Sequence, residues 1–326
     1  MMRTFASIAL AACALGLSNG AAAQPRFDSL VIFGTSLSDP GNFFALGGGK
    51  NTPPSYLVDE LLVPSVPYAR GGHHFSDGAT WVEQLARSLG MAASAKPALA
   101  NESRKAANYA VGGARARNTD HPFDLGEQTA AFLAERGGAA PSSPLYVVEM
   151  GGNDIRDAIE TFSRVFQATN DPAEATARAG DVLAGALSSI YQNIALLYGR
   201  GARNFLVVNA PDLGLTPAIR ALGPGATALA AGLSQQFNAG LDGVIAGFAG
   251  EPDIKLVRLD VYTKLQAIVA EPEGFGLINV TAACITPDVA PYHCKAFKDY
   301  LFWDGIHPTA AAHAIVAQQA AVDLGR

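Results

Sequence analysis

The sequence predicts an α/β fold in which helices cover both faces of a parallel sheet. Five short apolar runs, rich in β-branched or aromatic residues, have the length and composition of buried strands. Helical patterns lie between them, and strands that alternate with helices form parallel sheets buried on both faces. The chain has 326 residues, of which 49% are hydrophobic and 16% charged, so it can build one large core.

The expected elements follow one another in a regular order. A five-stranded parallel sheet is predicted from residues 29–33, 108–111, 145–150, 204–209 and 254–259, with helices at 78–89, 173–198, 226–248 and 309–324. Pro172 and Pro308 stand where a proline in the first turn of a helix is tolerated. Residues 43–75 carry few regular signals and are interrupted by glycines and prolines, so we expect a long excursion over the ligand crevice.

The charge and the histidine pattern argue against two classes of function. The formal net charge is -6 and no dense run of Lys and Arg occurs, so nucleic acid is not an expected partner. Five of the six histidines lack the spacing of metal ligands, so a zinc hydrolase is not expected; these five are His73, His74, His121, His293 and His313. Small or neutral substrates fit this composition better, and the oligomeric state is not determined by it.

The first 23 residues have the features of a secretory signal peptide. Arg3 precedes an apolar stretch, and three alanines ending at Ala23 form a small-residue cleavage pattern. We expect residues 1–23 to be removed, one domain at residues 24–326, no later segment that spans a bilayer, and a periplasmic or secreted protein. The alternative is a lipoprotein in which Cys13 carries the lipid, although the apolar run before Cys13 would be unusually short.

Removal of the signal peptide leaves two cysteines, Cys284 and Cys294. An exported protein reaches a compartment that permits disulfides, so we predict that the two cysteines pair. A bridge across so short a loop would stabilise the fold by about 2 to 3 kcal/mol, mainly by holding a local loop in shape. The alternative is a pair of buried free thiols.

Candidate catalytic residues stand at the ends of the expected strands. In an open parallel sheet the ligand crevice lies beyond the carboxyl ends of the strands. Ser36 follows the first strand, Gly112 and Gly113 follow the second, and Asn153 follows the third. A serine on such a turn can act as a nucleophile, and a glycine N–H or a side-chain amide can bind an oxyanion. Taken singly, each residue has a structural alternative as part of a tight turn or as a helix cap.

A carboxylate and a histidine near the C-terminus could serve this serine. Asp304 stands three residues before His307, close to where a helix is expected to begin. Asp304 would accept the proton of the imidazole Nδ1 and fix the tautomer, so that Nε2 faces the hydroxyl of Ser36. The structural alternatives are a capping role for Asp304 and a turn histidine with satisfied hydrogen bonds. The occurrence of all these elements in order, each at or just beyond a strand end, favours catalysis.

These motifs resemble the SGNH/GDSL hydrolase family over nearly the whole chain after the signal peptide. The blocks SLSDPGN, HFSDGATWVEQLA, NYAVGGA, GGND and FWDGIHPT are most similar to secreted bacterial and plant-like GDSL esterases and lipases. The resemblance implies a flavodoxin-like three-layer α/β/α sandwich and a serine carboxylic ester hydrolase without metal or organic cofactor. It assigns the nucleophile to Ser36, the remaining catalytic pair to Asp304 and His307, and the oxyanion donors to Ser36, Gly113 and Asn153.

One residue beside the expected nucleophile departs from the family pattern. The first block of the family usually reads Gly-Asp-Ser-Leu, and here Thr35 replaces the acid. Thr35 keeps a hydroxyl for hydrogen bonds within the turn but lacks a negative charge. We expect Ser36 to remain competent because the other catalytic residues are present. An attenuated enzyme, or a binding protein with a decayed site, is the alternative.

The resemblance points to an ester substrate without identifying it. Aromatic residues on the excursion or beside the catalytic pair could build an acyl or aryl pocket, with core packing as the alternative; they are Phe43, Phe44, Tyr56, Tyr68, Phe75 and Trp303. We expect short to medium acyl esters, including aryl esters, while long-chain lipids, choline esters, polyesters and acetylated sugars stay open. An acyltransferase that uses the same acyl-enzyme is a further alternative. Arg115 and Arg117 are expected in a solvated loop.

Overall fold

A computed structural model describes residues 27–51, 64–100, 105–286 and 294–326. The expected signal peptide with Cys13, and also Tyr56 and His293, lie outside the described residues. Within these ranges the central sheet has parallel strands in the order β1-β2-β3-β4, namely β1 (Leu30–Gly34), β2 (Leu145–Glu149), β3 (Asn204–Val208) and β4 (Lys255–Leu259). The predicted α/β class with a parallel sheet is confirmed.

The segment expected to form a fifth strand, residues 108–111, does not join this ladder. Asn108 makes an isolated parallel bridge with Ile32, so the segment lies beside β1 at the expected edge. The segment continues along β1, since the N–H groups of Tyr109 and Val111 donate to the carbonyls of Ile32 and Gly34 over 2.8 and 3.1 Å. One bond of a regular ladder is missing, because the N–H of Gly34 donates to the side chain of Gln128, 2.9 Å away, instead of to the neighbouring backbone. The central sheet therefore has four strands instead of the predicted five, because the Gln128 side chain accepts the Gly34 N–H that a regular fifth strand would have bound.

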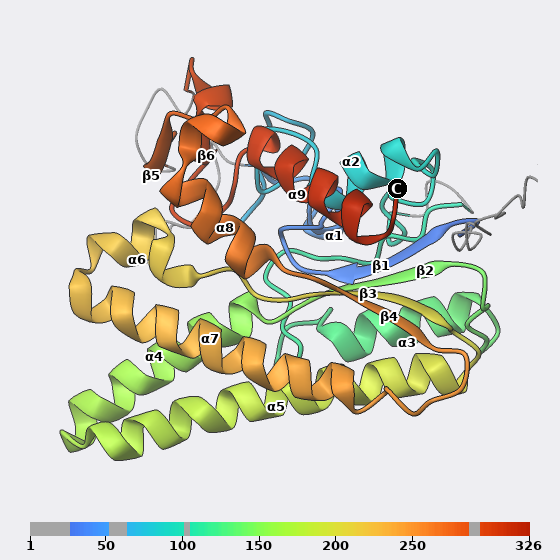
Figure 1. Ribbon diagram of the computed structural model, residues 1–326, viewed down its shortest axis with the longest axis horizontal. Coiled ribbons are helices and arrows are strands. Elements are labelled where there is room, and N and C mark those ends of the chain that lie inside the picture. Colours follow the sequence, from blue (N-terminus) through green and yellow to red (C-terminus); the bar gives the residue numbers. More distant parts are fainter. Residues whose placement is uncertain (1–26, 52–63, 101–104, 287–293) are drawn as a thin grey trace, which may run out of the picture.

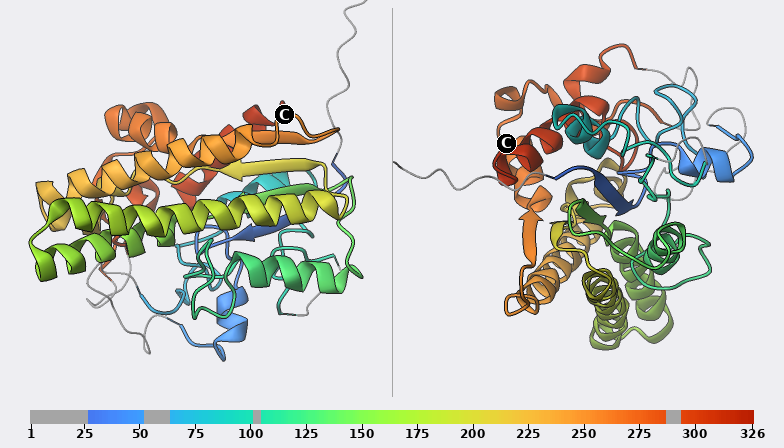
Figure 2. Two further views of the ribbon diagram at one scale, coloured as in Figure 1. Left: turned by 90° about the horizontal axis from the view of Figure 1, so that it is seen from below. Right: turned by 90° about the vertical axis from the view of Figure 1, so that its right-hand side faces the viewer.

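Helices cover both faces of the sheet and make the molecule a three-layer sandwich (Figures 1 and 2). One face is covered by α3 (Leu125–Glu135), α4 (Gly152–Thr169), α5 (Pro172–Gly199) and α7 (Pro224–Ala246), and the other by α2 (Trp81–Ser88), α8 (Val261–Ala270) and α9 (Ala310–Asp323). Shorter elements are α1 (Asn42–Leu46), α6 (Pro217–Ala221), η1 (Leu213–Leu215), η2 (Pro272–Phe275), η3 (Phe297–Asp299), β5 (Asn279–Ala283) and β6 (Tyr300–Phe302).

Side chains of each central strand alternate between two cores. Val31 and Phe33 of β1 pack with α3, α5 and α7, whereas Leu30 and Ile32 pack with α2 and α9. Because both faces of β1, β2 and β3 are buried, these strands are largely apolar runs, which is the signal that predicted them, whereas β4 at the sheet edge also carries Lys255 and Arg258. The helices α2, α5, α7 and α9 match the predicted ones closely, while α3, α4, α8 and the small β5-β6 sheet were not predicted.

The two prolines expected in first helical turns have different positions. Pro172 is the first residue of α5, and the preceding Asp171 caps the helix by accepting a hydrogen bond from the N–H of Ala173. Pro308 instead precedes Thr309, the residue that caps α9, and forms a bridge with β6. The prediction for Pro308 was wrong because a threonine hydroxyl, rather than the proline, begins this helix.

Helix α5 is long and apolar enough to cross a membrane by length and composition, the one such helix in the described part of the chain. We expected no segment after the signal peptide that spans a bilayer, and a single helix of this length and composition is only weak evidence against that expectation. In the structure it lies along α4 and α7 (Figure 2), and its residues Leu183, Ile190 and Ile194 are buried in the core under the sheet. We interpret α5 as a core helix of the sandwich.

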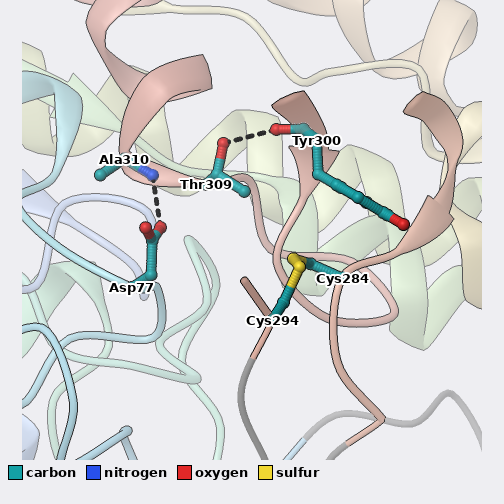
Figure 3. Close-up of a disulfide and its surroundings, with 6 residues drawn as sticks. All are labelled: Asp77, Cys284, Cys294, Tyr300, Thr309 and Ala310. Atoms are coloured by element: carbon teal, nitrogen blue, oxygen red, sulfur yellow. Dashed lines mark hydrogen bonds between the residues drawn. A yellow bond between two sulfur atoms is a disulfide. The ribbon is translucent and has the colours of Figure 1, made fainter. Parts of the chain in front are cut away.

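A small parallel sheet of β5 and β6 holds the chain that leads to Asp304 and His307. Cys284 and Cys294 form a disulfide beside it, with Cα atoms 5.6 Å apart (Figure 3). After this sheet, the Thr309 hydroxyl donates to the Tyr300 carbonyl over 2.7 Å, which fixes the start of α9. Both ends of the turn that carries Asp304 and His307 are thus tied down.

Candidate active site

Ser36 lies on a tight turn immediately after β1. The turn closes through a hydrogen bond of 3.0 Å from the N–H of Ser38 to the carbonyl of Thr35. A Cβ atom at Gly34 would lie 2.9 Å from the Cβ of Ser38, so the turn requires a glycine there. The neighbours Thr35 and Ser38 are buried, whereas Ser36 itself is half-buried. The turn therefore leaves this hydroxyl accessible at the carboxyl edge of the sheet.

The structure brings Ser36, His307 and Asp304 into one chain of hydrogen bonds. The Ser36 Oγ lies 2.9 Å from the His307 Nε2, and the His307 Nδ1 lies 2.8 Å from the Asp304 Oδ2. A carboxylate only accepts, so Nδ1 carries the imidazole hydrogen and Nε2 is the acceptor for the serine hydroxyl. This is the arrangement in which a histidine can remove the proton of a serine nucleophile.

Asp304 is completely buried and is held by three further donors. The hydroxyl of Tyr68 donates to its Oδ2 over 2.7 Å, and the N–H groups of Ile306 and His307 donate to its Oδ1 over 2.9 and 2.8 Å. Tyr68 is 2% exposed and packs edge-on against the buried Trp303. Tyr68 and Trp303 are therefore core residues, which was the alternative to a role in a substrate pocket. Sequence reasoning missed the bond from Tyr68 because more than two hundred residues separate the partners.

Phe75 packs between the histidine and the glycine turn. Its ring centroid lies 5.4 Å from that of His307. A Cβ atom at Gly112 would come within 2.2 Å of the Phe75 ring, so only glycine allows this close approach. The imidazole is thus supported by an aromatic face as well as by Asp304.

Thr35 is paired with a buried carboxylate that sequence reasoning did not assign. The N–H of Thr35 donates to Glu149 over 3.1 Å, its hydroxyl lies 3.0 and 3.1 Å from the two carboxylate oxygens, and the Ser38 hydroxyl donates over 3.0 Å. Burial raises the pKa of Glu149 to about 7, although these hydrogen bonds counteract the shift. An acidic residue at the end of an otherwise apolar strand was the available signal for Glu149.

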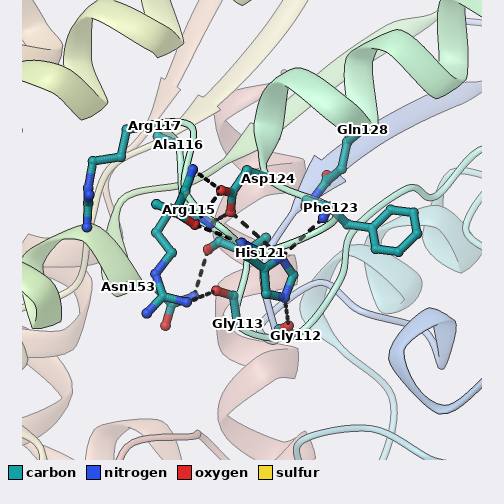
Figure 4. A network of polar contacts seen from close by, with 12 residues as sticks. Gly112, Gly113, Arg115, Ala116, Arg117, His121, Phe123, Asp124, Gln128 and Asn153 are labelled. Carbon is teal, nitrogen blue, oxygen red and sulfur yellow. Dashed lines mark hydrogen bonds and ion pairs between the residues drawn. The ribbon is translucent and has the colours of Figure 1, made fainter. Parts of the chain in front are cut away.

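The expected oxyanion donors come from two neighbouring segments. Gly113 has φ +81°, which favours glycine, and the Asn153 Nδ2 donates to the carbonyl of Ala114 over 2.8 Å (Figure 4). Asn153 is not the helix cap that was its structural alternative, because Gly151 occupies that position in α4. One hydrogen of the Asn153 amide therefore holds the amide against the glycine turn.

Two buried aspartates hold the glycine turn to its surroundings. The Oδ2 of Asp39 accepts from the N–H of Gly112 over 2.9 Å, and the Oδ2 of Asp154 accepts from the N–H of Ala116 over 2.8 Å. Burial raises the pKa of both carboxyl groups to about 6, against the lowering effect of their backbone hydrogen bonds. Above that pH both are charged acceptors that fix the segment.

The two arginines after the glycine turn are part of this structure rather than a solvated loop. Arg115 and Arg117 both form ion pairs with Asp157 of α4, and Arg117 also pairs with the buried Asp154. The Arg115 Nη1 donates to the carbonyl of Gly113 over 2.6 Å. The expectation of a solvated loop was wrong because α4, which was not predicted, supplies the carboxylates.

An apolar cavity of about 90 Å³ lies on the α8 and α9 side of the site. Leu37 lines it next to Ser36, and Ile306 and Pro308 line it on either side of His307. Further walls come from Trp81, Val208, Leu265, Ile268, Leu301 and Phe302. The polar groups on its wall include Glu149 and His313. Burial lowers the pKa of His313 to about 3, so its imidazole is neutral. In the described ranges, no cluster of three His, Cys, Asp or Glu residues is arranged to hold a metal ion.

Comparisons with known proteins identify the family of this chain. The family model for GDSL-like lipase/acylhydrolase matches residues 30–320. The chain belongs to this family. It is therefore a carboxylic ester hydrolase of the GDSL type. A GDSL esterase/lipase of Arabidopsis thaliana is 27% identical over 89% of this chain and 84% of its own length. Another from that plant is 31% identical over 57% of this chain and 52% of its own length.

Two bacterial lipases are also similar to this chain. Lipase 1 of Photorhabdus luminescens is 24% identical over 90% of this chain, which spans 49% of that protein. The crystal structure of an extracellular lipase from Streptomyces rimosus superposes with a TM-score of 0.42 at 15% identity, covering 90% of this chain and 99% of that one.

Proposed function

We propose that this protein is a serine esterase in which Ser36 is the nucleophile, His307 the general base and Asp304 the orienting carboxylate. The observation that carries the proposal is the unbroken series of contacts from the Ser36 Oγ through the imidazole to Asp304, at 2.9 and 2.8 Å. The imidazole of His307 has the tautomer that the chemistry needs, and its two nitrogens lie at hydrogen-bond distance from Ser36 and Asp304. Membership of the family supports the same assignment.

The proposed reaction passes through an acyl-enzyme. The His307 Nε2 removes the proton of Ser36 as the serine oxygen attacks the ester carbonyl, and the imidazolium then gives that proton to the departing alcohol. Water, deprotonated by the same imidazole, attacks the acyl-enzyme and releases the acid and the serine. Asp304 stabilises the imidazolium in both halves of the reaction. Hydrogen bonds from Tyr68 and two backbone N–H groups hold its carboxylate in place.

The negative charge on the carbonyl oxygen would be bound by the N–H groups of Ser36 and Gly113 and by the Asn153 amide. Two features support this assignment. The turn that carries Gly113 has glycine-type φ, and Asn153 is already bonded to the next residue of that turn. Donors fixed before the substrate arrives need no reorganisation during the reaction.

For the substrate, we propose esters with short to medium acyl chains or aryl groups. The apolar cavity supports this choice because Leu37 and Ile306, which adjoin Ser36 and His307 in sequence, line it, although Ser36 and His307 themselves are not among its lining residues. Its volume of about 90 Å³ is smaller than the roughly 150 Å³ apolar cavity that accepts a benzene ring, so it suits a short chain. Phe43 and Phe44, both half-buried, are available to contact the other part of the ester.

The nucleophile is tested by Ser36→Ala, with Ser163→Ala as the matched control on α4. Ser36→Ala should abolish hydrolysis of p-nitrophenyl acetate and labelling by a fluorophosphonate probe, while Ser163→Ala should retain both. Ser163 donates only to a carbonyl of its own helix, so its loss leaves the site intact. Persistence of hydrolysis and labelling in Ser36→Ala would refute the assignment.

The acyl preference is tested with p-nitrophenyl esters of increasing chain length. We expect kcat/KM to peak at a short chain and the peak to shift towards acetate in Leu265→Trp, because the larger ring fills the cavity. Val322→Trp, at an exposed position of α9, is the control and should leave the profile unchanged. A profile that is the same in Leu265→Trp and the wild type would show that the acyl chain lies elsewhere.

We also propose that the protein is exported, with residues 1–23 as a signal peptide and residues 24–326 as one hydrolase domain. The disulfide between Cys284 and Cys294 supports this proposal, because such bonds persist in oxidising compartments. N-terminal sequencing of the mature protein tests it, and a protein that still begins at residue 1 after expression in its host would contradict it.

A further inference from the structure

The orientation of one peptide group determines whether Gly113 can bind an oxyanion. The carbonyl of Gly112 and the N–H of Gly113 belong to the same peptide plane and point in opposite directions. Gly113 has φ +81°, and glycines have several backbone conformations of similar energy, so this plane needs an external partner to fix it. A side chain that holds the Gly112 carbonyl therefore also aims the Gly113 N–H.

His121 is the side chain that holds this carbonyl. Its Nε2 lies 3.2 Å from the carbonyl oxygen of Gly112 (Figure 4). In a trans peptide this is the side opposite to the Gly113 N–H. A Cβ atom at Gly113 would lie 3.4 Å from the same Nε2, so the imidazole is packed directly against the turn. The main chain of this loop is itself fixed, since the N–H of His121 donates to the hydroxyl of Thr119 over 3.1 Å.

The surrounding contacts determine which nitrogen of His121 carries the hydrogen. The N–H of Phe123 points at the His121 Nδ1 over 3.3 Å, closer than the Asp124 Oδ1 at 3.7 Å, which is beyond hydrogen-bond distance, so Nδ1 is an acceptor (Figure 4). The hydrogen of the neutral ring is then on Nε2, which donates to the Gly112 carbonyl. Burial lowers the pKa of His121, with Arg115 acting in the same direction and Asp124 and Glu127 opposing it, so the ring is neutral near pH 7.

The next two carbonyls of the turn are held in a similar way. The Gly113 carbonyl accepts from Arg115 over 2.6 Å, and the Ala114 carbonyl accepts from Asn153 over 2.8 Å. Arg115 is anchored in turn by Asp157 of α4, at 2.9 and 3.0 Å. Three consecutive carbonyls are therefore bound by three different side chains, and this leaves the peptide that carries the Gly113 N–H little freedom to turn over.

We propose that His121 is a positioning residue of the oxyanion hole, which holds the Gly112–Gly113 peptide so that the Gly113 N–H faces the oxyanion formed on Ser36. Donation to the carbonyl also polarises the peptide group and strengthens its N–H as a donor. The inference rests on the proposed function of Ser36 and extends it to a residue outside the recognisable motifs. Without His121, the peptide can rotate and present its carbonyl to the developing negative charge, which is repulsive.

The test compares His121→Ala, His121→Gln and the control Asp120→Ala in the same loop. Asp120 is exposed, so its removal changes the loop without touching the turn. We expect His121→Ala to lower kcat about tenfold or more for p-nitrophenyl acetate, with KM changed less than about threefold, because the contact acts mainly in the transition state. His121→Gln, whose amide can donate to the same carbonyl, should recover most of the loss, and Asp120→Ala should match the wild type.

A second measurement separates positioning from general damage to the fold. An alkyl trifluoromethyl ketone forms a tetrahedral adduct with a serine nucleophile, and its oxyanion needs the hole. His121→Ala should bind this inhibitor about tenfold more weakly, in parallel with the fall in kcat, while its thermal unfolding midpoint stays near that of the wild type.

Two results would overturn the inference. One is a His121→Ala enzyme with wild-type kcat and inhibitor affinity. The other is a loss that His121→Gln does not rescue and that accompanies a lowered unfolding midpoint, which would show a structural role only. Failure of the proposed function would look different, since Ser36→Ala would then remain active whatever the His121 variants do.

Discussion

Restoring the acid that the GDSL family usually carries at position 35 should impair this protein. Thr35 is 3% exposed, and its hydroxyl lies 3.0 and 3.1 Å from the two oxygens of Glu149. The structure thus already places a carboxylate beside the turn of Ser36, contributed by β2 instead of by the turn itself. Thr35→Asp would place a second carboxylate against that of Glu149. The remaining side-chain donor to Glu149, the Ser38 hydroxyl, is neutral and carries no compensating charge.

The size of the effect follows from Coulomb's law. Two unit charges about 4 Å apart repel by about 4 kcal/mol at an effective dielectric constant of about 20. The pair escapes this repulsion only if one group stays protonated, and burial already raises the pKa of Glu149 to about 7. We therefore expect Thr35→Asp to lower the free energy of unfolding by about 3 to 4 kcal/mol at pH 8 and by less at pH 5.5, and to lower kcat with it.

Urea denaturation at pH 8 and pH 5.5, together with hydrolysis of p-nitrophenyl acetate, measures both effects. Thr35→Ser keeps the hydroxyl and should behave nearly as the wild type. The double variant Thr35→Asp with Glu149→Gln returns to a single carboxylate and should recover most of the stability and activity. A single Thr35→Asp variant that is as stable as the wild type at pH 8 and turns over faster would refute the reasoning, and the natural protein would then be an attenuated enzyme.

Three further predictions follow from the contacts. Burial raises the pKa of Glu149 from 4.5 to about 7, so the folded state binds this proton more tightly than the unfolded state, and the free energy of unfolding falls as pH rises from 4.5 to 7. Urea denaturation at a series of pH values should show this fall in the wild type and a flatter pH dependence in Glu149→Gln. Tyr68→Phe removes the hydroxyl that donates to Asp304 and should destabilise the fold by about 1.5 to 3 kcal/mol and lower kcat, whereas no change in either would show that the bond is dispensable. Replacing Cys284 and Cys294 by serine should lower stability by about 3 kcal/mol without changing KM, and free thiols in non-reducing peptide mapping of the exported wild type would contradict the bridge.

The fold class and the principal candidate residues could be predicted because they leave local signals. Strands buried on both faces must be continuous apolar runs, so β1, β2 and β3 were visible in the sequence. Ser36, Asp304 and His307 were found because each sits in a short motif next to a strand end or a helix start. The helices α3 and α4 were not predicted, although α4 has a clear amphipathic pattern, and the absence of α4 from the prediction led to the error about Arg115.

The sequence alone determined the chemistry available at the carboxyl edge of the sheet and the order in which its residues are delivered there. The tertiary structure decided how those residues are held, because their partners are remote in the chain. Glu149 at the end of β2 meets Thr35 just after β1, Tyr68 donates to Asp304, and Gln128 takes a hydrogen bond that a regular fifth strand would have used. Hydrogen bonds between distant side chains depend on packing and leave no periodic pattern, which is why only the folded chain reveals them.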